Sequence, residues 1–390
     1  MSSGTSGEYW ADKALPSVFK HDLLRRYLPQ FGGMTGTQSY DKRVVYLDGY
    51  AGEGRYENGQ PASAEIALRV ASHLRSKAGL TLECFFSEAQ AKSYGRLQEV
   101  VQQYRASGVG VRAHAHHGEV DGVLDQVVER AVREPLFLFL DPCGLVLPQE
   151  RLVEVLARKR PQKRPATELL MNFSMMAVWR LGGHVRSPKG NEKSLQRFDD
   201  VCGGTWWREY FADAVASRGR NGAAEDAIEA VAGEYARRLE QRTGMVVQSV
   251  PVSHSPRQRA VYRLVFATRS PYGLWVFGDA VARARAEWWK ELEEREEDAL
   301  FSLAPDPKEV EARALPEIAA NLEKLLIRIR RPVKLVDHTL EIFGSFYGQV
   351  TEPVARQAVR LLHQQGKTPS NGVGVRRTRE ITVAPGSLPL

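Results

Sequence analysis

The sequence contains little cysteine and has no long apolar run. Its three cysteines, Cys84, Cys143 and Cys202, lie far apart and form no CxxC pair. This spacing excludes a disulfide framework and a cysteine-rich zinc site, so we expect buried thiols. No apolar run approaches the roughly 20 residues that a bilayer span needs, and the polar residues 1–7 lack a signal-peptide core. We therefore expect a cytoplasmic protein without a membrane segment.

Length and composition place the chain among ordinary globular proteins. It has 390 residues, of which 43% are hydrophobic and 26% charged. One hydrophobic core usually stops growing before this length, so a large domain with a small one is expected. The formal net charge is +7, and residues 315–390 hold 11 Lys and Arg against 6 Asp and Glu. This basic C-terminal region permits a polyanionic partner.

Strand-like and helix-like segments alternate through the N-terminal three-quarters of the chain. We expect a helix at 15–31, and strands with helices between them at 43–47, 80–86, 109–114, 136–140 and 168–173. Further strands at 246–252 and 262–268 are expected to close the sheet as an antiparallel pair. The pattern predicts an α/β fold with a doubly wound, mostly parallel Rossmann-like sheet and an insertion at about 188–242.

Two prolines, Pro305 and Pro307, mark the predicted domain boundary. We expect residues 1–303 to form the Rossmann-like domain, 304–314 a linker and 315–390 a separate module. Helices are expected in that module at 315–329, 336–346 and 352–365, followed by a β-ribbon at 373–383. Three helices and a ribbon indicate a winged-helix-like domain.

A glycine-rich turn, residues 48–54, follows the first predicted strand. Glycines let the backbone approach a ligand and tolerate positive φ, and open α/β sheets receive ligands at this place. Glu88, after the second strand, is positioned to accept hydrogen bonds from both ribose hydroxyls of an adenosine-containing cofactor. Glu119, after the third strand, is positioned to contact the adenine region. The predicted cofactor-binding residues are Asp48, Gly49, Tyr50, Ala51, Gly52, Gly54, Glu88 and Glu119.

The fourth predicted strand ends in Asp141-Pro142-Cys143-Gly144. Asp141 is suited to orient a substrate amine or hydroxyl, and Pro142 offers its carbonyl without a competing donor. These two residues are the predicted catalytic residues. Structural alternatives exist for each strand-end feature: a tight connection for the glycine turn, a solvated Glu88 and a turn-capping Asp141. Their occurrence at successive strand ends favours a site.

Four motifs together match one known pattern. They are residues 48–54, Asp141-Pro142-Cys143-Gly144, Asn172-Phe173-Ser174 and Phe266-Ala267-Thr268. This set resembles the three-Cys-motif partner proteins (TcmP), a bacterial family with a methyltransferase-like domain, over most of residues 8–300. The resemblance implies a methyltransferase-like fold, S-adenosylmethionine as cofactor, and a partner among the three-Cys-motif proteins related to radical enzymes.

The motif at Asp141 also looks like the Asp-Pro-Pro-Tyr signature of amino-methyltransferases that act on nucleobases. It departs from that signature at Cys143 and Gly144, so an aromatic that stacks on a flipped base must come from elsewhere, such as Tyr50 or Trp179. Pro-Cys also occurs in cytosine-C5 methyltransferases, where the thiolate attacks the base. The surrounding residues do not match that motif, and a buried Cys143 is expected.

Other reactive or aromatic residues favour structural roles. His114, His116 and His117 lack companion ligands at metal-binding spacing, so we expect a solvated loop and predict no metal. The pairs Trp206-Trp207 and Trp288-Trp289 are expected in half-buried core rather than stacked on bases.

Five arginines in residues 315–390 are candidate nucleic-acid contacts. Arg356 and Arg360 lie at i, i+4 on a predicted helix, and the predicted ribbon carries Arg376, Arg377 and Arg379. As a recognition helix and wing, they would meet phosphates and groove edges. Docking of another protein is the alternative, and salt dependence separates the two.

The sequence thus predicts an S-adenosylmethionine-dependent methyltransferase that works with a three-Cys-motif protein and has a nucleic acid as acceptor. The alternative is a non-catalytic partner protein that binds cofactor and recruits nucleic acid or protein through its C-terminal module. A metal-dependent phosphodiesterase using Asp48, Glu88 and Asp141 would explain the carboxylates but not the glycines.

Overall fold

A computed structural model describes residues 15–142, 144–145, 147–158, 166–187, 189–216, 223–255, 258–295 and 305–386. The chain divides into two compact units. The first comprises Met1–Ser17 and Leu28–Arg269, and the second Val18–Tyr27 and Ser270–Leu390. None of the described helices is long and apolar enough to cross a membrane.

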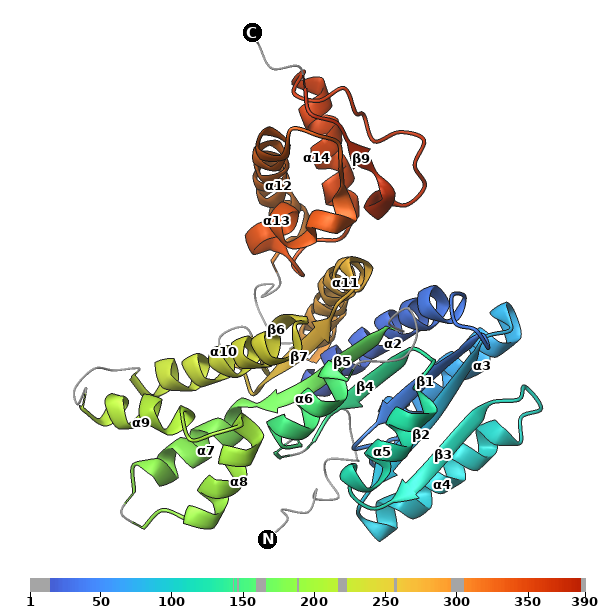
Figure 1. The fold of residues 1–390 in the computed structure, drawn as a ribbon, viewed down its shortest axis with the longest axis vertical. Coiled ribbons are helices and arrows are strands. Elements are labelled where there is room, and N and C mark those ends of the chain that lie inside the picture. Colours follow the sequence, from blue (N-terminus) through green and yellow to red (C-terminus); the bar gives the residue numbers. More distant parts are fainter. Residues whose placement is uncertain are drawn as a thin grey trace. The chain divides into compact units, whose positions relative to one another are not determined.

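The first unit contains a seven-stranded sheet with the order β3-β2-β1-β4-β5-β7-β6 (Figure 1). Its parallel strands are β1 (Arg43–Asp48), β2 (Thr81–Glu88), β3 (Arg112–His117), β4 (Leu136–Leu140) and β5 (Thr167–Ser174). Strand β7 (Tyr262–Thr268) runs antiparallel to both β5 and β6 (Val246–Val252). The predicted Rossmann-like sheet with an antiparallel pair at its end is confirmed.

Helices connect the parallel strands. Helix α2 (Leu15–Gly36) precedes β1, and the successive connections contain α3 (Ser63–Ala78), α4 (Ala91–Arg105), α5 (Asp121–Arg130) and α6 (Gln149–Ala157). The central strands are buried throughout: all five residues of β4 are at most 1% exposed. Leu138 of β4 packs in one core with Leu47 of β1, Val127 of α5 and Leu152 of α6. Phe137, on the opposite face of β4, packs against Phe31 of α2 with ring centroids 5.2 Å apart. Helices thus cover both faces of β4, which explains why this strand is continuously apolar.

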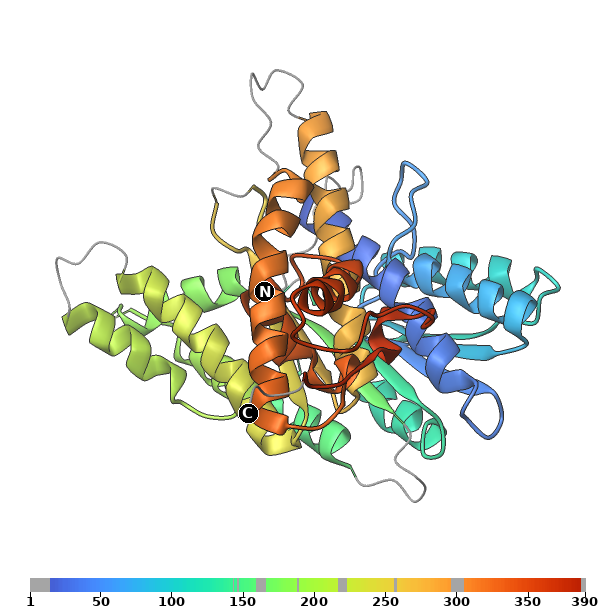
Figure 2. The same cartoon turned by 90° about the horizontal axis from the view of Figure 1, so that it is seen from above.

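An insertion of helices separates β5 from β6. After α7 (Met175–Val185) come α8 (Glu192–Cys202), α9 (Trp207–Ala216) and α10 (Ala223–Thr243), matching the insertion expected at 188–242. Within the first unit these helices, green to yellow in Figures 1 and 2, lie at the opposite end from β3 and α4. Trp207 is fully buried and donates to Asp199 at 2.8 Å, while Trp206 is half-buried. Both fit the predicted core role.

Strand β3 begins later than expected. It covers Arg112–His117 instead of 109–114, because Gly108 and Gly110 have φ of 75° and 79° and keep the chain in a turn. The three histidines therefore lie in this strand and not in a loop, which corrects the prediction. His114 stacks on Phe85 with ring centroids 4.6 Å apart, and His117 stacks on Tyr94 at 4.8 Å.

The second unit has its own apolar core. It contains α11 (Pro271–Arg295), α12 (Pro307–Ile329), β8 (Val333–Lys334), α13 (Thr339–Phe343), α14 (Pro353–Gln364) and β9 (Thr382–Val383). Short 3-10 turns lie at Leu335–His338 (η1), Gly344–Phe346 (η2) and Thr378–Glu380 (η3). The core combines Trp275 of α11, Leu322 of α12 and Val354 of α14.

The boundary of this unit differs from the prediction. Helix α11 begins at Pro271, and its Trp275 lies in the core of the second unit. The C-terminal segment of this unit therefore starts at Ser270 and not after residue 303, and Val18–Tyr27 also belongs to the unit. Helix α12 begins at Pro307, where Lys308 N–H donates to Asp306 Oδ1 at 2.9 Å. Residues 307–314, predicted as linker, are thus helical. An Asp cap followed by Pro in the first turn is a typical helix start.

The predicted β-ribbon at 373–383 does not form. Within that range only Thr382–Val383 is a strand, and it pairs antiparallel with Val333–Lys334. Gly372 and Gly374 have φ of 69° and 82°, so the preceding residues follow a loop. The predicted helix at 336–346 is replaced by 3-10 turns around the five-residue α13. The assignment as a winged helix remains a prediction.

Candidate functional site

The predicted site residues gather where the parallel strands end. Strands β1, β2 and β4 run in register, with Asp48 of β1 opposite Phe86 and Phe139. Glu88 is the last residue of β2, and Asp141 directly follows β4. Open α/β sheets bind ligands outside these carboxyl ends. The sequence therefore places the candidate residues at one edge of the sheet.

The glycine turn is fixed to strands on both sides of β1. Gly49 N–H donates to the Phe139 carbonyl and Ala51 N–H to the Ser87 carbonyl, both at 2.9 Å. A Cβ at Gly49 would lie 2.7 Å from Leu140 Cδ2 and 2.8 Å from Val120 Cγ2. Gly52 and Gly54 have φ of 58° and 80°. Glycine is therefore required at Gly49 by close packing and favoured at Gly52 and Gly54 by the left-handed backbone.

Glu88 is linked directly to this turn. Its Oε2 accepts a hydrogen bond from Gly52 N–H at 3.0 Å, and its Oε1 accepts one from Gln90 N–H at 2.7 Å. The carboxylate is half-buried. Two backbone donors thus hold the side chain of Glu88 beside the glycine turn.

Asp48 and Tyr50 form the inner part of the turn. Asp48 is fully buried, and its Oδ1 accepts from Tyr50 N–H at 3.2 Å. Burial raises the pKa of the Tyr50 hydroxyl, and the negative charge of Glu119 raises it further, while Arg197 opposes the rise. Tyr50 is therefore neutral at physiological pH. Because the charge of Arg197 acts on the Tyr50 hydroxyl, helix α8 of the insertion contributes to the electrostatics of this edge of the sheet.

The residue before Glu119, Gly118, is hydrogen-bonded to the backbone of Glu88. Gly118 N–H donates to the Glu88 carbonyl at 3.0 Å, and Ser87 Oγ donates to the Gly118 carbonyl at 2.8 Å. Glu119 itself is exposed. The backbone bonds of Gly118 therefore join the end of β2, with Glu88, to the segment that carries Glu119 after β3.

Asp141 has a partner that the sequence did not identify. Asn172 of β5 is 9% exposed, and its Nδ2 donates to Asp141 Oδ1 at 2.9 Å. The sequence carried no signal for this pair, which follows from the register of β4 on β5. Met171 pairs with Leu140, and the next residues of the two strands are Asn172 and Asp141. Pro142 is buried, and Cys143 lies outside the described residues. The predicted buried thiols are confirmed for Cys84 and Cys202.

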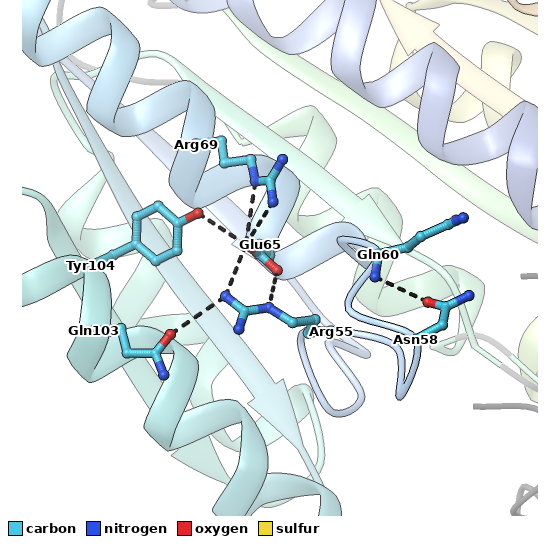
Figure 3. A network of polar contacts seen from close by, with 7 residues as sticks. All are labelled: Arg55, Asn58, Gln60, Glu65, Arg69, Gln103 and Tyr104. Carbon is cyan, nitrogen blue, oxygen red and sulfur yellow. Dashed lines mark hydrogen bonds and ion pairs between the residues drawn. The ribbon is translucent and has the colours of Figure 1, made fainter. Parts of the chain in front are cut away.

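A polar network holds the chain that leaves the glycine turn (Figure 3). Arg55 donates to the buried Glu65 through Nε at 2.6 Å and Nη2 at 3.0 Å. Arg69 and the Tyr104 hydroxyl each donate to Glu65 Oε1 at 3.0 Å. The Gly54 carbonyl accepts from Glu65 N–H at 3.3 Å. Glu65 thus joins the turn to α3 and α4.

Replacing Glu65 is expected to weaken the first unit. Burial alone would raise the pKa of Glu65, but hydrogen bonds from Arg55, Arg69 and Tyr104 outweigh it and lower the pKa. Glu65→Gln should reduce the free energy of unfolding at pH 7 by about 1–3 kcal/mol, because charge-assisted bonds to a buried acceptor are lost. Urea denaturation measures this change.

The pH dependence provides the control. A lowered pKa in the folded state stabilises the protein above the unfolded-state pKa, and this stabilisation is lost as pH falls through the folded-state value. The difference between the wild type and Glu65→Gln should therefore shrink below about pH 4. Glu129→Gln, on the exposed face of α5, should change stability little. Equal effects of both variants would contradict the role of Glu65.

The second unit separates the five predicted arginines into two groups. Arg356 donates to backbone carbonyls of Gly372 and Val375, and Arg379 is only 8% exposed. Both are corrections, since they were expected on an exposed surface. Arg356 instead holds a loop against α14, and Arg379 is buried with its guanidinium carbon 6.0 Å from the centroid of the Tyr272 ring. Arg360, Arg376 and Arg377 are exposed.

Comparison with known proteins finds no matching family model and no matching curated protein. Solved structures to which the chain is similar include the small RNA methyltransferase HEN1, at 11% identity and a TM-score of 0.30, covering 62% of this chain and 26% of that one. Trm1 from Pyrococcus horikoshii with S-adenosyl-L-methionine is 13% identical, with a TM-score of 0.31, and the match covers 66% of this chain and 56% of Trm1. An O-methyltransferase from Bacillus cereus in complex with SAH is 12% identical, with a TM-score of 0.31, and the match covers 64% of this chain and 80% of that one. The chain thus spans about a quarter of HEN1 and just over half of Trm1.

The topology of the sheet defines the fold class without those superpositions. The order β3-β2-β1-β4-β5-β7-β6, with β7 antiparallel to its neighbours, is that of a Rossmann-like methyltransferase sheet. The glycine turn and the strand-end acids lie at the edge where this kind of sheet binds its ligand.

Proposed function

We propose that the first unit binds S-adenosylmethionine at the edge formed by the glycine turn and Glu88, and that it transfers the methyl group to an acceptor. The observation that carries the proposal is the hydrogen bond from Gly52 N–H to Glu88 Oε2 at 3.0 Å. This bond joins the glycine turn after β1 to Glu88 at the end of β2 in one binding surface, called here the cradle. Its backbone N–H groups and its carboxylate would contact the same ligand. Nucleotide-binding sheets use this combination for an adenosine group.

The residues of this cradle fit the cofactor. The close packing of Gly49 and the left-handed Gly52 and Gly54 keep side chains out of the turn, so a ligand can approach the backbone. Glu88 would accept hydrogen bonds from the ribose hydroxyls, since a carboxylate has acceptor capacity beyond its two backbone donors. Glu119 would lie near the adenine, next to Glu88 along the edge.

Methyl transfer requires little acid-base chemistry from this chain. The bound cofactor supplies a methyl group on a sulfonium, which is a good leaving group, so positioning provides most of the catalysis. Asp141 would orient the amine or hydroxyl of the acceptor, and Asn172, which donates to Asp141 Oδ1, would hold that carboxylate in place. Asp141 with the predicted Pro142 remains the proposed catalytic pair.

The acceptor and partner belong to the same proposal. The resemblance to three-Cys-motif partner proteins supports a three-Cys-motif protein as partner. The positive charge concentrated in residues 315–390 supports a nucleic acid as acceptor. A non-catalytic protein that binds cofactor and recruits its partners is the alternative, motivated by Cys143 and Gly144 in place of Pro and Tyr.

Mass spectrometry of the purified full chain tests the proposal first. We expect co-purified S-adenosylmethionine or its demethylated product, and calorimetric titration should give saturable binding of added cofactor. A label-transfer screen with cellular RNA, DNA and metabolites then tests catalysis. Binding without transfer to any acceptor supports the non-catalytic alternative. No heat at millimolar cofactor, in a folded sample, contradicts both.

A further inference from the structure

The exposed arginines of the second unit lie on two adjacent segments. Arg360 is on α14, and Arg376 and Arg377 are on the loop between α14 and β9. We propose that these three residues, called here the arginine surface, bind the phosphodiester backbone of a nucleic acid. The proposal deepens the proposed function, since it names the chemistry by which an acceptor nucleic acid would be held.

Arg356 brings the two segments together. Its Nη1 donates to the Gly372 carbonyl at 2.5 Å, and its Nη2 donates to the carbonyls of Val375 at 2.8 Å and Arg376 at 3.3 Å. These bonds hold the loop against α14. Arg360 is one helical turn after Arg356 and on the same face of the helix. The loop arginines Arg376 and Arg377 are therefore held beside that face.

The loop is shaped to present its side chains. Asn371 Oδ1 accepts from Val373 N–H at 2.9 Å, and glycines with positive φ stand on both sides of Val373. These local bonds fix the loop before any ligand binds, so less conformational entropy is lost on binding. Arg376 and Arg377 follow this turn directly.

The arginine surface carries uncompensated positive charge. Within the described residues, no acid lies at ion-pair distance from any of its three guanidinium groups, whereas Arg328 of α12 is paired with Glu341 and Lys367 with Glu323. Exposed guanidinium groups without acidic partners suit phosphate oxygens, to which they bind through paired N–H donors. Three of them on adjacent segments would contact successive phosphates.

The surroundings favour a nucleic acid over an acidic protein. Protein interfaces usually have an apolar centre with aromatic residues inside a polar rim. Among the described residues from Pro353 to Gly386, the only exposed large apolar side chain is Val373, at 66%. A surface dominated by charge is typical of backbone contacts to nucleic acids, which depend on release of counterions.

Binding of fluorescent oligonucleotides to the full chain tests the proposal. The probes are a single-stranded RNA, a duplex RNA and a duplex DNA, each of about 25 nucleotides per strand, titrated between about 50 and 200 mM salt. The triple variant Arg360→Ala, Arg376→Ala, Arg377→Ala should bind at least tenfold more weakly. The slope of the logarithm of its binding constant against the logarithm of salt concentration should be smaller in magnitude by about 2–3, because three phosphate contacts are lost. The three probes identify which nucleic acid is preferred.

A matched control removes the same charge elsewhere. Arg237, Arg259 and Arg328 are exposed, and each is paired with a glutamate. Replacing these three with Ala should leave the salt slope close to that of the wild type. Cofactor affinity of the arginine-surface variant, measured by calorimetry, should also be unchanged. If the proposed function is wrong, the wild type should fail to bind the cofactor. If only the arginine surface is wrong, the wild type should bind the cofactor and the triple variant should bind oligonucleotides as the wild type does.

Arg356 provides a test of geometry at constant charge. Arg356→Lys keeps the charge but replaces the planar guanidinium, which donates from two nitrogens, by a single ammonium nitrogen. This nitrogen cannot reproduce the geometry of the three bonds, so the loop should move and affinity should fall severalfold. Arg360→Lys should retain most affinity, because Lys still binds phosphate as a point charge. Equal affinity of the triple and control variants, or no binding of any probe at about 50 mM salt, overturns the proposal. In that case an acidic protein becomes the partner to examine.

Discussion

Glu88→Ala is expected to lower the affinity for S-adenosylmethionine by at least about 100-fold. The reason is that Glu88 would supply two charge-assisted hydrogen bonds to the ribose, each contributing about 1.5–3 kcal/mol, and about 1.4 kcal/mol corresponds to a factor of ten. The variant also removes the acceptor of the Gly52 and Gln90 N–H groups, so the turn loses one of its anchors. Isothermal titration calorimetry measures the dissociation constant directly.

Glu57→Ala is the matched control for Glu88. Glu57 lies in the loop between β1 and α3, its side chain is 51% exposed, and its Oε1 lies 3.5 Å from Arg96 Nη1. Because it is not at a strand end, its removal should leave cofactor affinity within about twofold. Circular dichroism should show both variants folded. Wild-type affinity of a folded Glu88→Ala protein would contradict the assignment of the cofactor site to this edge.

The first unit was largely predictable because its signals are local. Continuous apolarity at Leu136–Leu140 identified β4, and alternation of strands with helices indicated a mostly parallel sheet. Parallel strands also indicated the site, since residues that follow them share an edge. Asp48, Glu88 and Asp141 could therefore be grouped before any distance was known.

The contacts of these residues were not predictable in the same way. Asn172 donates to Asp141 across two neighbouring strands, and no periodicity in the chain encodes that pairing. The partners of Glu65 come from the turn, from α3 and from α4, with up to 39 residues between donor and acceptor. Such networks depend on tertiary packing. Only the presence of charged residues near the turn was visible in the sequence.

The second unit shows where local patterns mislead. Residues 373–383 have the alternation and basic side chains of a strand, but Gly372 and Gly374 take positive φ and Arg356 captures the carbonyls that a ribbon would pair. Likewise, Pro305 and Pro307 suggested a boundary, although proline in a first turn starts a helix equally well. The core contact of Trp275 assigned α11 to the second unit.

Gly49→Ala is expected to impair both stability and cofactor binding. The new methyl group would lie 2.7 Å from Leu140 Cδ2 and 2.8 Å from Val120 Cγ2, within overlap distance of two buried side chains. Overpacking of this kind costs about 1–3 kcal/mol of unfolding free energy, and relief would require the turn to move away from β4. Because the same turn would hold the cofactor, affinity should fall at least tenfold even where the protein remains folded.

Gly95→Ala separates packing from the general effect of replacing a glycine. Gly95 lies on the exposed side of α4, and a Cβ there would meet no atom within 4 Å. This variant should be more stable than the wild type by about 0.5–1 kcal/mol, because alanine favours a helix, and it should bind the cofactor normally. Denaturant unfolding and calorimetry of both variants give the comparison. A Gly49→Ala protein with wild-type stability and affinity would contradict the close packing of the turn against β4, and with it the reason that a glycine occupies this edge of the sheet.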